Sequence, residues 1–200
     1  MSLFRIDPVG LPGLAALALG FLGFFAALMA ARYRAGRSEK VATARRNRAS
    51  WIWIMVQGLG IAIAGYGRID VKLDPMSAKA IVEAAATLVL MLGAVGLFHA
   101  SSLTMGKNWS LVARTRTDHQ LVQTGPFAVV RHPIYVALFL FMLAMAIAYG
   151  HTANLILAVP IYAVATWLRV RHEEQLLRAQ FGPEYDAYAT RVKRFVPGLF

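Results

Sequence analysis

The stretch that decides the fold is PIYVALFLFMLAMAIAY, residues 133–149, which holds seventeen residues without a charged side chain. A run of about 17 to 25 apolar residues is long enough for a helix to cross the hydrocarbon core of a bilayer. Arg131 and His132 come directly before this run, and Tyr135 lies within its first turn. The sequence therefore predicts a membrane-spanning helix with polar side chains gathered at one end.

The whole chain has the composition of an integral membrane protein. Of its 200 residues, 58% are hydrophobic and 16% are charged, whereas about 25% of the residues in an average soluble domain are charged. This length suffices for one compact bundle, so we expect a single membrane-embedded domain over residues 1–200. The chain has no cysteine, which excludes a disulfide framework, a thiolate metal site and a catalytic cysteine.

Five apolar runs have the length of a transmembrane helix. They cover about residues 11–31, 51–67, 80–103, 133–149 and 152–168. Only Gly150 and His151 separate the last two runs, which predicts a tight helical hairpin, and Pro160 predicts a kink in the fifth. The predicted fold is an all-α integral membrane protein with five transmembrane helices and a cytoplasmic C-terminal helical segment.

Basic residues give the expected orientation. Seventeen of the 21 Lys and Arg residues lie in residues 32–50, in residues 101–131 or after Leu168. Because Lys and Arg accumulate in cytoplasmic loops, we expect an outer N-terminus and a cytoplasmic C-terminus in a bacterial inner membrane. The net charge of +11 predicts attraction to anionic membrane lipids. The basic residues are spread over three segments without a recognition motif, so we expect no binding of nucleic acid.

The polar residues before the fourth run suggest an anion site. Pro133 suits the first turn of a helix and favours an extended conformation at His132. The free N–H groups of the helix start, together with Arg131 and His132, would attract a carboxylate or a phosphate, and Tyr135 would add a hydroxyl. The alternative is that Arg131 reaches lipid phosphates while His132 and Tyr135 anchor the helix at the membrane interface.

Glu173 and Glu174 favour a ligand site on the same side. They follow the fifth run by about one turn, where Leu176, Leu177 and Phe181 suggest that the helix continues past the membrane. Adjacent carboxylates repel each other, so a cationic or hydroxyl-rich ligand would explain them. The structural alternative is neutralisation within the helix, by pairing Glu173 with Arg169 and Glu174 with Arg178 at i,i+4 spacing.

These segments together resemble the membrane methyltransferases that include isoprenylcysteine carboxyl methyltransferases and phospholipid N-methyltransferases. The resemblance covers about residues 105–200. It is carried by GKNWS (106–110), HQLVQTGPFAVVRHPIYVA (119–137) and HEEQLLRAQFGPEYDAYATRVKRFVP (172–197) in this order. Two positions depart from the family pattern, with Phe127 in place of a Tyr and Ala137 in place of a Gly.

The resemblance implies S-adenosylmethionine as cofactor. We expect no metal, because the His and Glu residues lack a ligand spacing such as His-Glu-x-x-His. The resemblance also implies that residues 105–200 bind the cofactor on the cytoplasmic side and that a lipophilic acceptor, an isoprenylcysteine-type carboxylate or a lipid headgroup, enters from the bilayer. The cofactor-binding residues would be His119, Leu121, Val122, Gly125, His132, Tyr135, Glu173 and Glu174. The catalytic residues would be Arg131, His132 and Tyr135.

Two other functions remain open from the sequence. Membrane reductases of the sterol reductase type share the layout of this half and use NADPH, but a phosphate-rich dinucleotide should not favour the two adjacent carboxylates. A non-catalytic membrane protein could bind lipid or a partner through the basic loops. The oligomeric state, the acceptor and the role of Glu83 do not follow from the sequence.

Overall fold

The computed structural model describes residues 6–36, 48–106, 109 and 120–199. These residues form helices, with three isolated β-bridges and no extended strand among them. The elements in chain order are α1 (Leu11–Gly36), α2 (Arg48–Ala64), α3 (Ala78–Met105), η3 (Gly125–Ala128), α4 (Pro133–Ala148), η4 (Thr152–Asn154), α5 (Leu155–Phe181) and α6 (Pro183–Arg191). The fold is therefore all-α, as predicted.

Three of the described helical segments are long and apolar enough to cross a membrane: Leu11–Ala35, Ala78–Met105 and Thr152–Phe181. The apolar helices Trp51–Ala64 and Pro133–Ala148 are shorter. At 1.5 Å per residue, the 16 residues of α4 measure about 24 Å, less than the roughly 30 Å of a hydrocarbon core. Five apolar helices are present where they were predicted, and the count of five complete spans stays a prediction.

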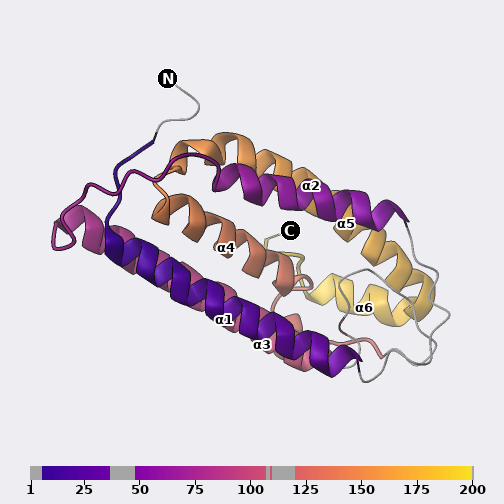
Figure 1. Ribbon diagram of the computed structural model, residues 1–200. Coiled ribbons are helices and arrows are strands. Elements are labelled where there is room, and N and C mark those ends of the chain that lie inside the picture. The colour runs from indigo at the N-terminus through magenta and orange to yellow at the C-terminus, as the bar shows by residue number, and fades with distance from the viewer. Residues whose placement is uncertain (1–5, 37–47, 107–108, 110–119, 200) are drawn as a thin grey trace.

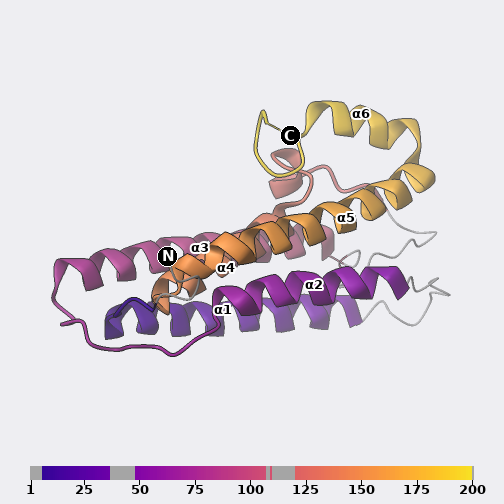
Figure 2. The same cartoon turned by 90° about the horizontal axis from the view of Figure 1, so that it is seen from above.

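The helices form two packed groups with α4 between them (Figure 1). α1 packs along α3, α3 packs along α4, and α2 packs along α5. The turned view in Figure 2 shows the C-terminal part of α5 rising away from the other helices, with α6 turned back to lie to one side of the bundle at this end. This end carries Glu173, Glu174 and the start of α4, and we call it the polar end.

The predicted hairpin of the last two apolar helices is confirmed only as a short connection. α4 and α5 diverge from it, because α4 packs mainly on α3 whereas α5 packs mainly on α2. The two helices still touch at Tyr162 of α5. Its ring lies 5.9 Å from that of Phe139, and its hydroxyl donates a hydrogen bond to the carbonyl of Tyr135 at 2.7 Å. α5 runs without interruption across Pro160.

Small residues allow the helices to approach closely. Ala80, Ala94, Ala144 and Ala158 are completely buried, and a Cβ at Gly60 of α2 would lie 3.1 Å from the backbone nitrogen of Tyr162. Close packing of small residues is typical of helix interfaces in membranes, where hydrophobic burial drives association little. The large apolar side chains of α1 and α2 that remain exposed lie on the outside of the bundle, in agreement with contact to lipid: Leu19, Leu22, Phe25, Ile52, Met55 and Leu59.

Candidate functional site

The start of α4 is fixed by the chain end that follows α6. Pro133 occupies the first turn of α4, as predicted, and His132 caps the helix with φ −127° and ψ 57°, non-helical but not fully extended. The backbone N–H groups of Arg131 and His132 donate to the carbonyls of Lys193 and Arg194 at 2.8 and 3.0 Å. The segment that follows α6 therefore runs beside the residues that precede α4.

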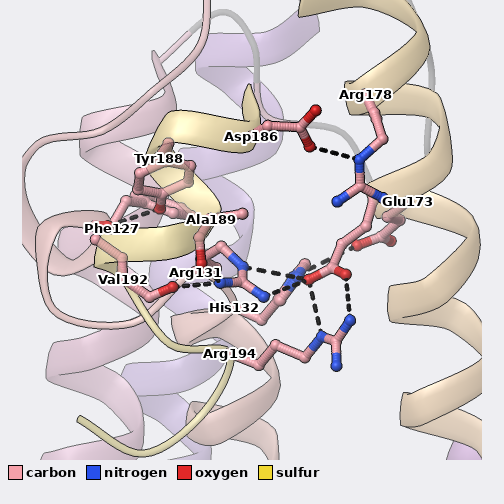
Figure 3. A network of polar contacts seen from close by, with 11 residues as sticks. Phe127, Arg131, His132, Glu173, Arg178, Asp186, Tyr188, Ala189, Val192 and Arg194 are labelled. Carbon is pink, nitrogen blue, oxygen red and sulfur yellow. Dashed lines mark hydrogen bonds and ion pairs between the residues drawn. The ribbon is translucent and has the colours of Figure 1, made fainter. Parts of the chain in front are cut away.

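Glu174 is the centre of a cluster of cationic side chains at the polar end (Figure 3). Its carboxylate accepts from Nε and Nη2 of Arg131 at 3.2 and 3.1 Å, and from Nε and Nη2 of Arg194 at 3.0 and 2.6 Å. Nε2 of His132 lies 3.3 Å away. With 4% of its surface exposed, Glu174 is buried among these partners.

Arg131 extends this cluster to the end of α6. Its Nη1 donates to the carbonyl of Ala189 at 2.8 Å and also to the carbonyl of Val192. The guanidinium thereby joins the residue before α4, the polar part of α5 and the end of α6. Four guanidinium nitrogens converge on Glu174, and Nη1 of Arg131 binds two backbone carbonyls. Because these contacts share partners, moving any single side chain would break several of them.

The electrostatics of Glu174 follow from these contacts. The residue lies in the polar extension of α5 beyond Leu168, outside the apolar stretch. Burial alone would raise its pKa, but hydrogen bonds from His132 and Arg194 and the charge of Arg131 hold the pKa of the carboxyl well below its usual range. Glu174 is therefore ionised and fully engaged with side chains of its own chain.

Glu173 has a different environment, with 20% of its side chain exposed. Its Oε1 accepts from the hydroxyl of Tyr135 and from Nε of Arg169, the latter at 3.2 Å. Nδ1 of His132 lies 3.9 Å from Oε2. Glu173 thus faces two of the three side chains that were predicted as catalytic, His132 and Tyr135, and its carboxylate is partly exposed.

Aromatic rings lie beside the side chains that contact the two carboxylates. The ring of His132 lies 5.8 Å from that of Tyr135 and 6.0 Å from that of Phe195. The guanidinium of Arg194 lies 4.7 Å above the ring of Trp167. The polar end therefore combines charged groups with aromatic rings, of which those of His132 and Tyr135 are buried.

The segment before α4 contacts α3 and α6. Leu121 and Val122 are half-buried, and Gln123 beside them bonds to Glu184 and Arg191 at 3.2 and 3.0 Å. Gly125 has φ +58°, and a Cβ there would lie 2.7 Å from Oγ1 of Thr104. The predicted residue His119 lies outside the described residues.

Two features of the cluster were missed by the reasoning from sequence. Arg178 was expected to pair with Glu174, but its Nε donates to Asp186 of α6 at 2.6 Å (Figure 3). Arg194 takes that place, although its only signal in the sequence was the excess of basic residues after Leu168. By contrast, the expected pair of Arg169 and Glu173 is present.

Tyr185 adds an unused polar group near this cluster. The residue is 1% exposed, and its hydroxyl has no hydrogen-bond partner among the described residues. Burial raises the pKa of Tyr185 above its usual value, and the nearby charge of Glu174 adds to this effect. A buried hydroxyl without a partner is costly, so a ligand that supplied one would be favoured.

Among the described residues, no group of three or more His, Asp or Glu side chains is arranged to hold a metal ion. That the protein needs no metal stays a prediction.

Known proteins resemble the chain in sequence and in fold. The nickel-cobalt-cadmium resistance protein NccN of Alcaligenes xylosoxydans xylosoxydans is 36% identical over 107 residues, which are 52% of this chain and 49% of that protein. The protein-S-isoprenylcysteine O-methyltransferase of Tribolium castaneum is 32% identical over 115 residues, 54% of this chain and 39% of that protein. The chain thus spans about half the length, or less, of these curated relatives.

The fold matches a solved membrane enzyme. The structure of the eukaryotic intramembrane Ras methyltransferase, isoprenylcysteine carboxyl methyltransferase, aligns with a TM-score of 0.52 at 21% identity. The alignment covers 93% of this chain and 65% of that one. At this identity the likeness concerns the fold.

The family model described as phospholipid methyltransferase matches residues 82–184, just over half of the chain. This region runs from α3 through the Arg131–His132 start of α4 to Glu173, Glu174 and the first residues of α6. The resemblance derived from the sequence is thereby confirmed. The chain belongs to the phospholipid methyltransferase family.

Proposed function

We propose that the protein transfers a methyl group from S-adenosylmethionine to a lipophilic acceptor at the cytoplasmic side of a membrane. The observation that carries this proposal is the convergence of Arg131, His132 and Tyr135 with Glu173 and Glu174 at the polar end. These residues lie about 40 positions apart in the chain, within the region that matches the methyltransferase family.

The polar end suits the chemistry of S-adenosylmethionine. The cofactor has an amino acid part with both charges, a sulfonium, ribose hydroxyls and a flat adenine ring. The partly open carboxylate of Glu173 would accept from an ammonium or a hydroxyl, and the unused hydroxyl of Tyr185 supplies a further partner. The partly buried ring of Phe195 lies 6.0 Å from the ring of His132 and would add apolar contact. The residues present therefore fit the group.

The two carboxylates would take different roles. Glu173, His132 and Tyr135 would touch the cofactor, with His119, Leu121, Val122 and Gly125 lining it from the preceding segment. Glu174 is saturated by Arg131, Arg194 and His132, so a direct contact would displace one of them. We therefore assign Glu174 and Arg131 to positioning, and we expect them to hold His132 and the start of α4 in place.

The reaction needs alignment more than acid-base chemistry. When bound, the cofactor supplies an electrophilic methyl group on a sulfonium sulfur; the carbon–sulfur bond breaks as the bond to the acceptor forms, and the sulfur keeps the electron pair. A carboxylate acceptor releases no proton, whereas an amine or a thiol releases one. His132 and Glu173 are the groups at the polar end that would take such a proton. Orientation alone can supply several kcal/mol.

The expected acceptor is lipophilic, either an isoprenylcysteine-type carboxylate or a lipid headgroup. The site lies at the end of a bundle whose outer surface is apolar, which favours entry from the bilayer. The relatives named as isoprenylcysteine methyltransferases support a carboxylate. Neither an NADPH-dependent reductase nor a non-catalytic lipid-binding protein is favoured by an observation of its own.

The test is transfer of a labelled methyl group by the purified full chain. The acceptors would be a prenylated cysteine with a free carboxylate and a phospholipid with an amino headgroup. We expect label in at least one of them, and we expect the Glu173→Gln variant to lose most of this activity. The Asp186→Asn variant, which breaks a surface ion pair, serves as the matched control. Labelling of small water-soluble acceptors alone would contradict the proposal.

A further inference from the structure

Gln57 is a buried amide on a helix that is otherwise apolar. It is the single amide or charged side chain between Trp51 and Ala64 of α2, and it is 3% exposed. A polar side chain within an apolar helix is costly unless it is hydrogen-bonded, and in membrane proteins it is a candidate for a functional role. α2 lies outside the region that matches the methyltransferase family.

Both ends of the Gln57 amide are bound to α5. Its Nε2 donates to Oγ1 of Thr166 at 2.7 Å, and its Oε1 accepts from Nη1 of Arg169 at 3.2 Å. Thr166 and Arg169 are three residues apart and therefore lie on the same face of α5. The amide thus fixes one arm of the Arg169 guanidinium.

Arg169 carries this constraint to the candidate site. Its Nε donates to Oε1 of Glu173 at 3.2 Å, and its guanidinium lies 5.1 Å from the centre of the Tyr135 ring. Tyr135 in turn donates its hydroxyl to the same oxygen of Glu173. A planar guanidinium held on two sides presents its remaining donors in fixed directions. The orientation of the Glu173 carboxylate therefore depends on where Gln57 holds Arg169.

The association of α2 with α5 has an independent cause. Gly60 lies nearly one turn after Gln57 and lets the backbone of α2 approach α5 closely. A Cβ at this position would lie 3.1 Å from the backbone nitrogen of Tyr162 and 3.2 Å from the carbonyl oxygen of Ala158. This close approach holds the two helices together without an amide. The contribution that depends on Gln57, and not on Gly60, is thus the position of Arg169.

From this geometry we infer that Gln57 is a positioning residue for methyl donor binding. It holds Arg169, and Arg169 sets the Glu173 carboxylate toward a cationic or hydroxyl group of S-adenosylmethionine. The inference rests on the proposed function. It also gives α2, a helix without a family motif, a part in the site.

The test measures, by calorimetry, how tightly S-adenosylmethionine binds to the purified full chain and to two variants of it. Gln57→Met keeps the length of the side chain and removes the amide, so we expect binding about three- to tenfold weaker, the range for a lost hydrogen bond. Thr166→Val removes the other partner of Gln57 and leaves the bond to Arg169, so it should bind within about twofold of the wild type. Equal loss in both variants, or wild-type affinity in Gln57→Met, would overturn the inference.

A double-mutant cycle separates positioning from general stability. If Gln57 acts through Glu173, adding Gln57→Met to a Glu173→Gln variant should weaken binding no further. If Gln57→Met weakens binding by the same factor in the Glu173→Gln variant as in the wild type, the inference is overturned. Should Gln57→Met fail to fold, Gln57→Glu keeps an acceptor for Arg169 and should retain near wild-type affinity, and a tenfold loss there would count against the inference.

The same experiment distinguishes this inference from the proposed function. Absence of binding to the wild-type chain would overturn the proposed function and the inference together. Wild-type binding that is unchanged in Gln57→Met would overturn the inference alone.

Discussion

Arg131 and Glu174 form a buried ion pair between the residues that precede α4 and the polar part of α5. Nη2 of Arg131 lies 3.1 Å from Oε1 of Glu174, and the two side chains are 9% and 5% exposed. Since Arg131 also binds backbone carbonyls at the end of α6, this pair joins three parts of the site. The adjacent Glu173 is more open, so the two neighbouring carboxylates lie in different environments.

Glu174→Gln should destabilise the ligand-free protein. The change leaves Arg131 and Arg194 without their counterion, and removal of one partner from a buried ion pair costs about 3 to 5 kcal/mol. We expect a melting temperature several degrees lower in the same detergent. Asp186→Asn breaks the exposed pair with Arg178, where about 0 to 1 kcal/mol is expected. Equal melting temperatures for the two variants would contradict the buried role of Glu174.

The contribution of Glu174 should depend on pH in one direction. Because its partners lower the pKa of the carboxyl from the usual 4.5, the stabilisation is complete above pH 4.5 and is lost as the pH falls below it toward the lowered pKa. The difference in melting temperature between the wild type and Glu174→Gln should therefore be constant near neutral pH and shrink in acid. A difference that grows as the pH falls would be inconsistent with an ionised, paired carboxylate.

Gly125→Ala should be destabilising for a reason that is independent of the cofactor. The backbone at Gly125 has φ +58°, and the new Cβ would lie 2.7 Å from Oγ1 of Thr104, so conformational strain adds to a steric clash. We expect a loss of about 1 to 3 kcal/mol. Gly58→Ala is the control, because a Cβ there meets no atom within 4 Å. Thermal unfolding of both variants checks this, and a stable Gly125→Ala protein would contradict the geometry.

The orientation of the chain is testable with reporter fusions. The excess of basic residues at one end predicts that a reporter active in the cytoplasm works at Phe200 and fails in the connection around Asp74. Activity at both positions would overturn the five-span topology.

The sequence predicted the helices, because their positions are determined by residues that are close together in the chain. The apolar runs located all five apolar helices, and Pro133 located the start of α4. The apolar residues Leu176, Leu177 and Phe181 correctly indicated that α5 continues past Leu168. Hydrophobic periodicity and proline act within a few residues, so a single sequence contains them.

The sequence was a poorer guide to which helices pack together and which charged side chains pair. Spacing alone suggested Arg178 as the partner of Glu174, but the turn at Gly182 brings Asp186 of α6 to Arg178 instead. Arg194 reaches Glu174 because the chain after α6 returns to the start of α4. The coupling of Gln57 to Arg169 likewise requires that α2 packs on α5. Such contacts depend on tertiary packing and not on sequence distance.

The most direct test of the account is calorimetric titration of the purified chain and its Glu173→Gln variant with S-adenosylmethionine, its demethylated product and NADPH. The central claim is that the polar end binds the methyl donor through the open carboxylate of Glu173. The wild type should bind the first two ligands and not NADPH, and Glu173→Gln should lose about 1.5 to 3 kcal/mol of binding free energy, the scale of a hydrogen bond to a charged group, while its melting temperature stays near that of the wild type. Binding of NADPH alone, or undiminished binding of S-adenosylmethionine by the Glu173→Gln variant, would contradict the account.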